Sequence, residues 1–593
     1  MNVLFFLAIP IILFFLASKF YAKWIAKNLG ENAVNPTPAV TINDGRDYVP
    51  TKRYVVFAHH FSAIAGAGPI IGPTMAVLYG FIPAWMWVVV GGIFLGAVHD
   101  FTTMFISLRE KGKSIAEVAR NTLGKTGFNL MITFTIMMLL LVCSSFLSAT
   151  AISLTSLWPL SKLGVEGTDT ILKTITADGI TYGRIGGIAS TSVIFITLCA
   201  PFLGWLIHKK GIKTLYAYLL ASAICIISVL LGIQFPVSLQ PFHWMIIISI
   251  YVLIASGTPV WIILQPRDFI NVQILYGGIL LMVISLLSVG FGGASVSLPN
   301  FNFSEGAQSL GMIWPMMFIT IACGAISGFH SLVGGGTTCK QLSNETDARK
   351  VSFNSMLLES LLAICVLLAI GVGLSFIDYK SIVWPSDPAI KSNPILGFSL
   401  AAGNLFHQGL GIPVSLGTVF GILLVEGFVI TTLDAAVRLN RYLFEELWVI
   451  LFQNPKRFLK NYWFNSLLTV IFMFVLAYSN AFSVLWPIFG TANQLLAALA
   501  LITVSSWLVL KGKKYFFALF PALFMLATTI TSLVILFLSY VEKSNYILIV
   551  VDVFLFMLSL GVVVLAVNTF LKMSRIIIFP SRVQKDSPPI IVI

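Results

Sequence analysis

Two adjacent histidines, His59 and His60, stand in an apolar stretch that continues into three glycines and two prolines, FAHHFSAIAGAGPIIGP at 57–73. Histidine takes up and releases protons near neutral pH, so this pair is suited to carry a coupling proton. Neighbouring side chains on a helix diverge by about 100°, so at most one of the two rings can face a site. The alternative is a pair of neutral rings that hydrogen-bond to backbone carbonyls.

Few other ionisable residues stand inside apolar runs; these are His99, Asp100, His330, Glu359, Glu426, Asp434 and Asp552. A charge at the centre of a bilayer costs at least about 2.5–3.5 kcal/mol, so such residues usually mark function. Structural readings stay open for some of them. Asp100 and Asp434 could pair with Arg109 and Arg438. Glu426 could bond to a neighbouring helix, and Asp552 is expected to be structural.

A metal site is the other chemistry that these residue types allow. His59, His60 and His330 could meet in space with carboxylates around them. No HExxH sequence is present, and the six cysteines lack ligand-like spacing. We therefore expect no metal and no other cofactor, and neither a disulfide nor a nucleophile–base constellation for an enzyme.

The composition is that of an integral membrane protein. The chain has 593 residues, of which 58% are hydrophobic and only 10% are charged, whereas soluble proteins carry about 25% charged residues. We interpret the apolar start as a retained first span, because its lysines follow the apolar run and do not precede it. The chemistry must therefore take place within the bilayer.

Fifteen apolar runs are long enough to cross a membrane. They lie near 2–18, 54–79, 83–108, 128–158, 186–207, 212–235, 242–264, 271–293, 311–333, 353–376, 412–434, 463–480, 482–510, 515–540 and 545–571. With the amino terminus outside and the carboxyl terminus in the cytoplasm, the inner segments hold 30 of the 36 Lys and Arg residues, as the positive-inside rule requires. The net charge of +13 thus reflects topology and not a nucleic-acid partner. The segment 441–453 is predicted to be an interfacial helix, and 377–411 an outer loop.

Four spans carry Gly/Pro interruptions, at Gly66–Pro69, Ser256–Pro259, 323–338 and 485–494. Spans 2 and 7 are five crossings apart and run in opposite directions, which is the pattern of an inverted-repeat transporter. This predicts a first span and cytoplasmic linker (1–53), two repeats (54–235 and 242–434), and a last part (435–593) with an interfacial segment, four spans and a basic tail. The breaks at Gly66–Pro69 and Ser256–Pro259 should face each other across one cavity.

Several blocks of the sequence resemble the carbon starvation A (CstA) family. These are AHHF with AIAGAGP, GAVHDF, QPRDF, ITIACGAISGFHSLVGGGTTCKQL, EGFVITTLDAAVR and LWPIFGTANQLLAAL, in family order from about Asp44 to Leu499. The resemblance implies an all-α transporter of the amino acid–polyamine–organocation (APC) superfamily, with a LeuT-like 5+5 inverted repeat and extra flanking spans. Two departures are Cys339, where the family pattern leads us to expect proline, and a length below that of the longer members, which implies a reduced carboxyl-terminal region.

The resemblance and the breaks together give a set of candidate site residues. Substrate or ion contacts are assigned to His59, His60, Gly66, Gly68, Pro69, Asp100, Ser256, Gly257, Gly324, Ser327, His330, Glu426 and Asp434. A gate or a structural ion pair is assigned to Gln265, Arg267 and Asp268.

The predicted function is secondary active import of di- and tripeptides across the inner membrane, coupled to protons and associated with carbon starvation. Import of pyruvate with protons is the alternative, and a nutrient-binding membrane sensor is a further one. Sodium coupling stays open, because unwound carbonyls with Ser327, Thr337 and Thr338 could form an oxygen cage. The expected partners are a small-molecule substrate and the lipid bilayer, and the sequence does not fix an oligomeric state.

Overall fold

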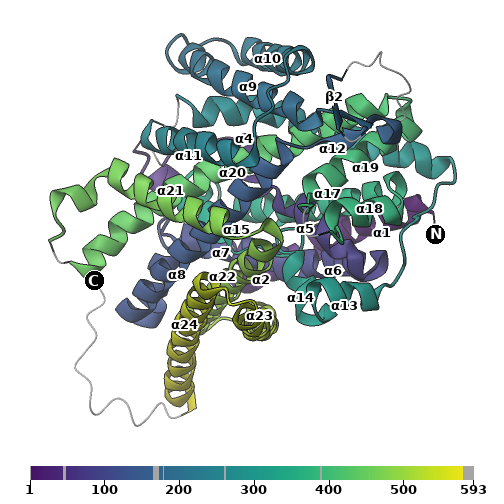
Figure 1. The fold of residues 1–593 in the computed structure, drawn as a ribbon. Helices are drawn as coiled ribbons and strands as arrows, with labels where there is room; N and C mark the ends of the chain where they lie inside the picture. The colour runs from purple at the N-terminus through teal and green to yellow at the C-terminus, as the bar shows by residue number, and fades with distance from the viewer. Residues whose placement is uncertain are drawn as a thin grey trace.

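The computed structural model describes residues 2–44, 48–163, 172–177, 179–259, 262–387, 390–452 and 454–578. The predicted basic tail begins after residue 571; its first residues, to 578, continue the last helix, and the rest lies outside the described residues. Apart from one small sheet, the described chain is helical (Figure 1). The sheet is antiparallel, with the strand order β1-β3-β2, and consists of β1 (Trp158–Pro159), β2 (Thr174–Ala177) and β3 (Ile180–Gly183).

The amino-terminal half of the chain supplies twelve α-helices. They are α1 (Val3–Leu16), α2 (Ala22–Leu29), α3 (Pro38–Thr41), α4 (Arg53–Ile64), α5 (Gly68–Ala76), α6 (Phe81–Gly91), α7 (Ala97–Arg109), α8 (Ile115–Ser153), α9 (Ile185–His208), α10 (Thr214–Gln234), α11 (Pro241–Gly257) and α12 (Leu264–Phe291). Single π-helical turns join α1 to α2 and α6 to α7, so each of these pairs is one continuous span.

The carboxyl-terminal half supplies the rest. Its α-helices are α13 (Phe303–Leu310), α14 (Ile313–Thr320), α15 (Phe329–Gly336), α16 (Thr346–Ala348), α17 (Asn354–Gly373), α18 (Phe376–Val383), α19 (Pro394–Leu410), α20 (Val414–Leu451), α21 (Tyr462–Ser479), α22 (Phe482–Leu510), α23 (Phe516–Glu542) and α24 (Tyr546–Ile578). A π-helical turn at Arg349–Phe353 leads into α17.

The described residues form 12 helices that are long and apolar enough to cross a membrane, or 13 if the bent pair α4–α5 counts as one span. The chain is therefore a multi-pass membrane protein. The predicted count of fifteen is not confirmed. Each predicted run does fall on a helix or a broken pair, but α11 has only 17 residues, about 25 Å, and α14 and α15 have eight each.

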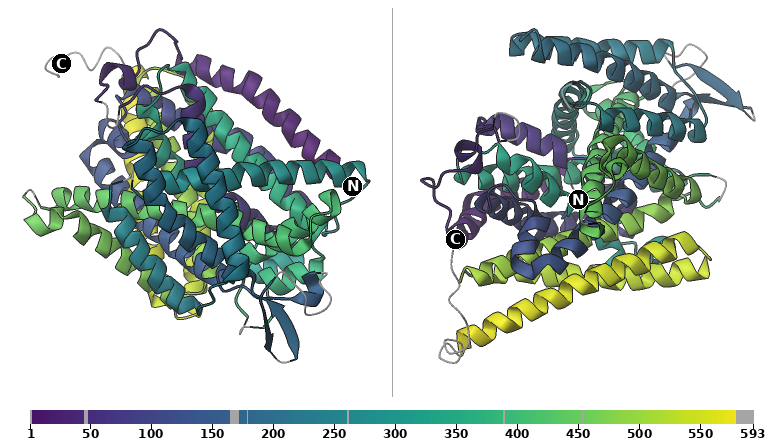
Figure 2. Two further views of the ribbon diagram at one scale, coloured as in Figure 1. Left: turned by 90° about the horizontal axis from the view of Figure 1, so that it is seen from above. Right: turned by 90° about the vertical axis from the view of Figure 1, so that its left-hand side faces the viewer.

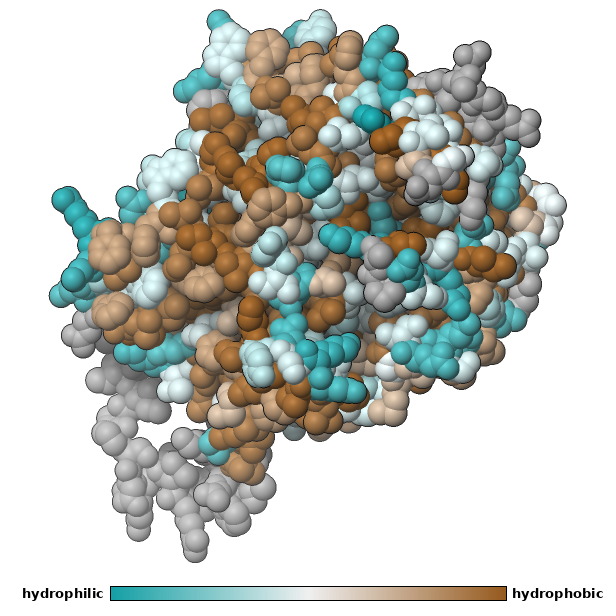
Figure 3. Space-filling model, in the orientation of Figure 1, coloured by the Kyte–Doolittle hydropathy of each residue, from teal (hydrophilic) through white to brown (hydrophobic). Residues whose placement is uncertain are grey.

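The helices are arranged around a buried centre. Helices α9 and α10 lie on one flank and α23 and α24 on the opposite flank, as Figure 1 and the right-hand view of Figure 2 show. Between them, α22 packs against α8 and α23, and α20 packs against α8 and α19. Apolar side chains cover much of the surface formed by α11 and α21 (Figure 3), as expected for a surface that faces lipid.

Two segments between the predicted spans differ from expectation. The segment 441–453 is not a separate interfacial helix, because α20 continues without interruption to Leu451 and buries Phe444 on the way. The predicted outer loop 377–411 contains α18 and the largely buried α19. Helix α19 approaches α20 so closely that a Cβ at Gly403 would lie 2.3 Å from Oγ1 of Thr418. Helix α19 packs through small residues and has no long apolar run. The sequence therefore does not mark it as a membrane span.

Candidate functional site

The first predicted break is present in the structure. Helix α4 ends at Ile64 and α5 begins at Gly68, and the two helices meet at an angle of 45°. The non-helical residues are therefore 65–67, at the glycine-rich start of the predicted segment Gly66–Pro69. Pro69 stands in the first turn of α5. Backbone N–H groups in a first turn have no intrahelical partner, so a proline there costs no hydrogen bond.

A second break lies directly against the first one. Helix α14 ends at Thr320 and α15 begins at Phe329, which leaves residues 321–328 unwound. A Cβ at Gly68 would lie 2.3 Å from Sγ of Cys323, and a Cβ at Gly72 would lie 2.7 Å from the carbonyl oxygen of Thr320. Glycine is thus required for the two unwound segments to approach each other.

The predicted break at Ser256–Pro259 is confirmed only in part, because Thr258 and Pro259 are not helical but stand at a helix end. Helix α11 simply ends at Gly257, and the chain then turns towards α12; Val260 and Trp261 lie outside the described residues. The Ser256 carbonyl accepts a hydrogen bond from Arg441 (3.0 Å), and Gly257 packs against the ring of Trp463. This segment therefore does not face Gly66–Pro69. A glycine–proline pattern marks a helix end as well as a break, which explains the error.

Helix α22 holds the second break in place. The block 485–494, predicted to be interrupted, is continuously helical despite Pro487. The Asn493 side chain accepts a hydrogen bond from the Phe329 amide (3.0 Å) and donates one to Ser327 Oγ (3.1 Å). Gln494 donates to the Phe318 carbonyl (2.7 Å). Asn493 and Gln494 are not among the candidate residues from the sequence, although two amide side chains in an apolar run are a usable signal.

Four ionisable residues form a chain of contacts beside the second break, which we call the buried relay: His99, Asp100, His330 and Glu359. Nδ1 of His99 lies 2.8 Å from Oδ1 of Asp100, and Nδ1 of His330 lies 2.8 Å from Oδ2. Nε2 of His330 lies 3.3 Å from Oε2 of Glu359. All four side chains are buried. Asp100 thus pairs with histidines and not with Arg109, which pairs with Glu345 at 2.7 Å.

Close helix packing brings the members of the relay together. His99 and Asp100 are on α7, His330 is in the first turn of α15, and Glu359 is on α17. A Cβ at Gly92 would lie 2.3 Å from Oγ of Ser360, and a Cβ at Gly96 would lie 2.3 Å from the Ala325 carbonyl oxygen. These glycines begin and end the π-helical turn before α7, a feature that is frequent at functional sites. Gly324 also packs closely, against Ala363 of α17.

The adjacent histidines have different surroundings. His60 is buried, and its Nδ1 lies 2.9 Å from Oγ1 of Thr338. His59, which precedes it on α4, is exposed. Only one ring thus turns inward, as the helical geometry predicts. Among the described residues, no group of three or more His, Cys, Asp or Glu side chains is arranged so that it could hold a metal ion.

The candidate sodium cage does not assemble from all three predicted hydroxyls. Ser327 precedes α15 and is bonded to Asn493, whereas Thr338 follows α15 and contacts His60. The eight residues of α15 separate them by roughly 12 Å. Thr337 donates to the carbonyl of Val333. A hard cation needs all of its oxygen ligands within about 2.3–2.6 Å. Ser327 and Thr338 are too far apart to bind the same ion.

A second buried ion pair joins α12 and α20. Arg267 Nη1 lies 2.7 Å from Oδ2 of Asp434, and the Tyr251 hydroxyl of α11 donates to the same oxygen at 2.6 Å. Arg438 does not pair with Asp434 as the sequence allowed; it donates to the Ala255 carbonyl. Arg267 and Asp434 are both 1% exposed. Of the neighbouring candidates, Gln265 is exposed, and Asp268 lines a cavity of about 10 Å³ together with Ser62 of α4.

Two carboxyl groups stand apart from these clusters. Glu426 of α20 is fully buried, and neither of its carboxyl oxygens has a hydrogen-bonding partner among the described residues. It lies within interaction range of Ser153 on α8. Asp552 is buried on α24, at the flank of the molecule. Glu426 and Glu359 are thus both buried carboxyl groups whose oxygens lack a close hydrogen-bonding partner among the described residues.

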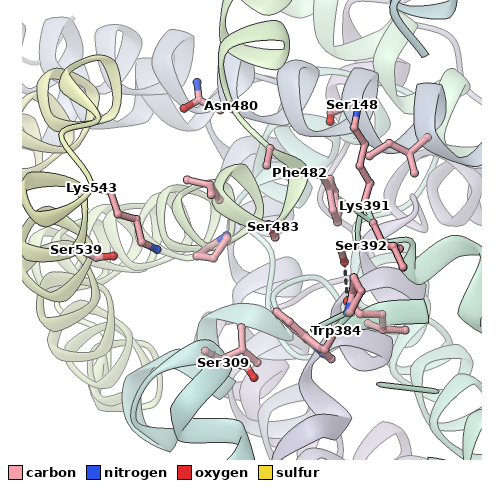
Figure 4. Close-up of a pocket in the computed structure, with 18 of the residues that line it drawn as sticks. Ser148, Ser309, Trp384, Lys391, Ser392, Asn480, Phe482, Ser483, Ser539 and Lys543 are labelled. Atoms are coloured by element: carbon pink, nitrogen blue, oxygen red, sulfur yellow. Dashed lines mark hydrogen bonds between the residues drawn. The ribbon is translucent and has the colours of Figure 1, made fainter. Parts of the chain in front are cut away.

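A large vestibule opens towards the outer segments of the predicted topology. Its volume is about 850 Å³, and its wall includes Trp384, Ser392, Ser483 and Lys543 (Figure 4). Ser148 of α8, Met316 of α14 and Pro487 of α22 also line it. Met316 is one helical turn from Thr320, where the second break begins. The vestibule thus extends almost to the facing breaks.

The sequence profile described as "Carbon starvation protein CstA" matches residues 2–388 and 375–532, which is most of the chain. This chain belongs to the CstA family. A curated relative in Campylobacter jejuni, named peptide transporter CstA, is 31% identical over 577 residues, covering 87% of this chain and 78% of the relative. The Bacillus subtilis peptide transporter CstA is 30% identical, covering 84% and 83% of the two chains.

Another CstA relative has a different name. The Escherichia coli pyruvate/proton symporter BtsT is 27% identical, covering 87% of this chain and 79% of the relative. Among solved structures, a manganese transporter variant from Eremococcus coleocola (TM-score 0.46, 11% identity, covering 90% and 97%) is similar. So is MhsT in complex with L-phenylalanine (TM-score 0.45, 12% identity, covering 81% and 99%).

Proposed function

We propose that this CstA-family chain is a secondary active transporter that imports small peptides across the cytoplasmic membrane by alternating access, driven by protons. The observation that carries the proposal is the contact between two broken helices, α4–α5 and α14–α15, at Gly68 and Cys323. Broken helices leave backbone N–H and carbonyl groups free to bind a ligand, and their ends add partial charges. In this arrangement the second repeat would begin at α14 and not at α11.

The cavities support an outward-facing state. The vestibule of about 850 Å³ approaches the breaks from the side of the predicted outer segments. On the predicted inner side, the cavity beside Ser62 and Asp268 measures only about 10 Å³. The buried Arg267–Asp434 pair and the Arg441 bond to Ser256 join α11, α12 and α20 on that side. We interpret these contacts as the closed inner gate.

Glu426 favours a peptide over pyruvate as the substrate. A peptide carries an ammonium group that a buried carboxylate can pair with, whereas pyruvate has only a carboxylate and a keto oxygen. Glu426 is buried without a hydrogen-bonding partner among the described residues, at a helix that contacts α8 beside the vestibule. The names of the Campylobacter and Bacillus relatives agree with a peptide. The Escherichia coli relative keeps pyruvate as the second candidate.

Uptake by purified protein in proteoliposomes tests the proposal. With an inward pH gradient and no sodium, we expect the wild type to accumulate labelled dialanine and to lose this activity with a protonophore. Replacing Glu426 with glutamine removes the charged partner of the amine. A hydrogen bond to a charged group contributes about 1.5–3 kcal/mol, so the KM for dialanine should rise roughly 10- to 100-fold.

The matched control is Asp552→Asn, which neutralises another buried carboxyl group, at the flank of the molecule. It should leave dialanine uptake unchanged. If the wild type accumulates labelled pyruvate and ignores dialanine, the peptide assignment is wrong. If neither compound is accumulated under proton or sodium gradients, the transporter proposal itself fails.

A further inference from the structure

The contacts within the buried relay determine where hydrogens can lie. Asp100 receives two contacts of 2.8 Å, one from Nδ1 of His99 and one from Nδ1 of His330. An ionised carboxylate can only accept hydrogen bonds, so each Nδ1 must carry a hydrogen. If His330 is neutral, its Nε2 is then a bare acceptor.

That bare acceptor faces a second acceptor. Nε2 of His330 lies 3.3 Å from Oε2 of Glu359, and the backbone carbonyl of Ile64 is a further acceptor near the His330 ring. Oε2 of Glu359 has no other hydrogen-bonding partner among the described residues. Two lone pairs at this distance, buried and without water between them, repel each other. A proton on Oε2 of Glu359 removes the repulsion, because the carboxylic acid then donates a hydrogen bond to Nε2 of His330. The cluster therefore needs an additional proton, between His330 and Glu359, besides the two hydrogens on the Nδ1 atoms that contact Asp100.

The charge of the relay leads to the same result. Without this additional proton, Asp100 and Glu359 would place two negative charges in a fully buried cluster. With it, the cluster carries one. The other titratable groups around the cluster are His60 of α4, whose ring lies beside Gly334 of α15, and the thiol of Cys323 in the unwound segment. Among the described residues, no Arg or Lys side chain forms an ion pair with this cluster that would balance the second charge.

We infer that the proton shared by His330 and Glu359 is the coupling proton of the transporter, an inference that rests on the proposed function. Loading forms an O–H bond on Glu359 from a hydronium ion and leaves a water molecule; release reverses this step on the other side. His330 is in the first turn after the unwound residues 321–328. A swing of α15 about that segment would separate Nε2 from Glu359 on α17 and let the proton leave.

The experiment compares Glu359→Gln with the wild type in two measurements. The first is infrared spectroscopy of the purified protein, which detects the C=O stretch of a protonated carboxylic acid without any transport. We expect Glu359→Gln to lose one such band. The control Asp552→Asn, also a buried carboxyl group, should keep that band.

The second measurement separates coupling from substrate movement. At one-to-one stoichiometry, a gradient of one pH unit drives about tenfold accumulation of labelled dialanine. Glu359→Gln should reduce this ratio to one, while exchange of labelled for unlabelled dialanine across the membrane continues. Gradient-driven accumulation by Glu359→Gln equal to that of the wild type, or an unchanged infrared band, would overturn the inference.

A second variant covers the case in which Glu359→Gln does not fold. Glu359→Asp keeps a titratable carboxyl group but shortens the side chain by one methylene, so it should still accumulate dialanine with a shifted pH profile. A profile identical to that of the wild type would contradict the role of Glu359. Lack of uptake by the wild type itself would overturn the proposed function, whereas the infrared measurement would still report on the shared proton.

Discussion

Replacing Asp434 with asparagine is expected to destabilise the protein by about 3–5 kcal/mol, because it leaves the buried Arg267 guanidinium without its counter-charge. Both side chains are 1% exposed, and Arg267 Nη1 lies 2.7 Å from the Asp434 carboxylate. The Tyr251 hydroxyl, which donates to the same oxygen, would lose a charged acceptor as well. Thermal unfolding in detergent measures the effect as a lower midpoint, and the opened inner gate should reduce dialanine accumulation.

Two further variants make this measurement specific. Glu305→Gln breaks the Lys380–Glu305 pair, whose side chains are 37% and 35% exposed, and such a pair contributes at most about 1 kcal/mol. The double variant Arg267→Gln with Asp434→Asn removes both charges and should recover part of the lost stability. If Asp434→Asn is no less stable than Glu305→Gln, the pair does not close an inner gate in the way we describe.

Replacing Gly68 with alanine is expected to abolish transport and to destabilise the fold by more than the 1–3 kcal/mol usual for overpacking. Its Cβ would lie 2.3 Å from Sγ and 2.5 Å from Cβ of Cys323. The clash would push α5 away from the unwound segment 321–328, so the two breaks could no longer meet. Unfolding midpoints and dialanine uptake measure the two effects separately.

The chain offers both a control and a rescue for this variant. Gly336→Ala changes a glycine at the end of α15 that has no described atom within 4 Å of a built Cβ, and it should retain wild-type uptake. Adding Cys323→Gly to Gly68→Ala removes the two clashing atoms and should restore folding. Normal uptake by Gly68→Ala alone would show that close contact between the breaks is not needed.

The sequence was sufficient to predict the first break and the approximate position of the second. At Gly66–Pro69 and within 323–338, glycine and proline interrupt runs that are otherwise apolar enough to span a membrane. A break in lipid must be satisfied by neighbouring groups, so such interruptions stand out. The helix boundaries in the structure, Ile64 to Gly68 and Thr320 to Phe329, follow them closely.

The partner of the first break could not be read from the sequence. Gly257 and Gly68 have similar neighbours along the chain, but Gly257 packs against Trp463 whereas Gly68 packs against Cys323. Gly490 looked like part of an interruption, yet it lets the intact helix α22 approach the carbonyl of Ile319, 2.4 Å from a built Cβ. The role of a glycine in an apolar run depends on which residue of another helix packs against it. Only the tertiary structure gives that residue.

The relay was only partly predictable for the same reason. Asp100 and His330 were selected as candidates because they are ionisable and stand in apolar runs, but their pairing spans 230 residues. The rotation of α7, α15 and α17 about their axes decides which side chains meet, and it is set by close contacts such as Gly92 with Ser360. Periodicity along one helix does not contain this information.

The most direct test of alternating access is reciprocal cysteine labelling during transport, with one cysteine introduced at a time, at Ser483 in the vestibule or at Ser62 beside the small cavity. The background replaces Cys199, the one cysteine of the six that is not buried. On adding dialanine and an inward pH gradient, we expect labelling of Ser483→Cys to fall and labelling of Ser62→Cys to rise. Labelling that stays constant at both positions, or that changes in the same direction at both, would contradict the account.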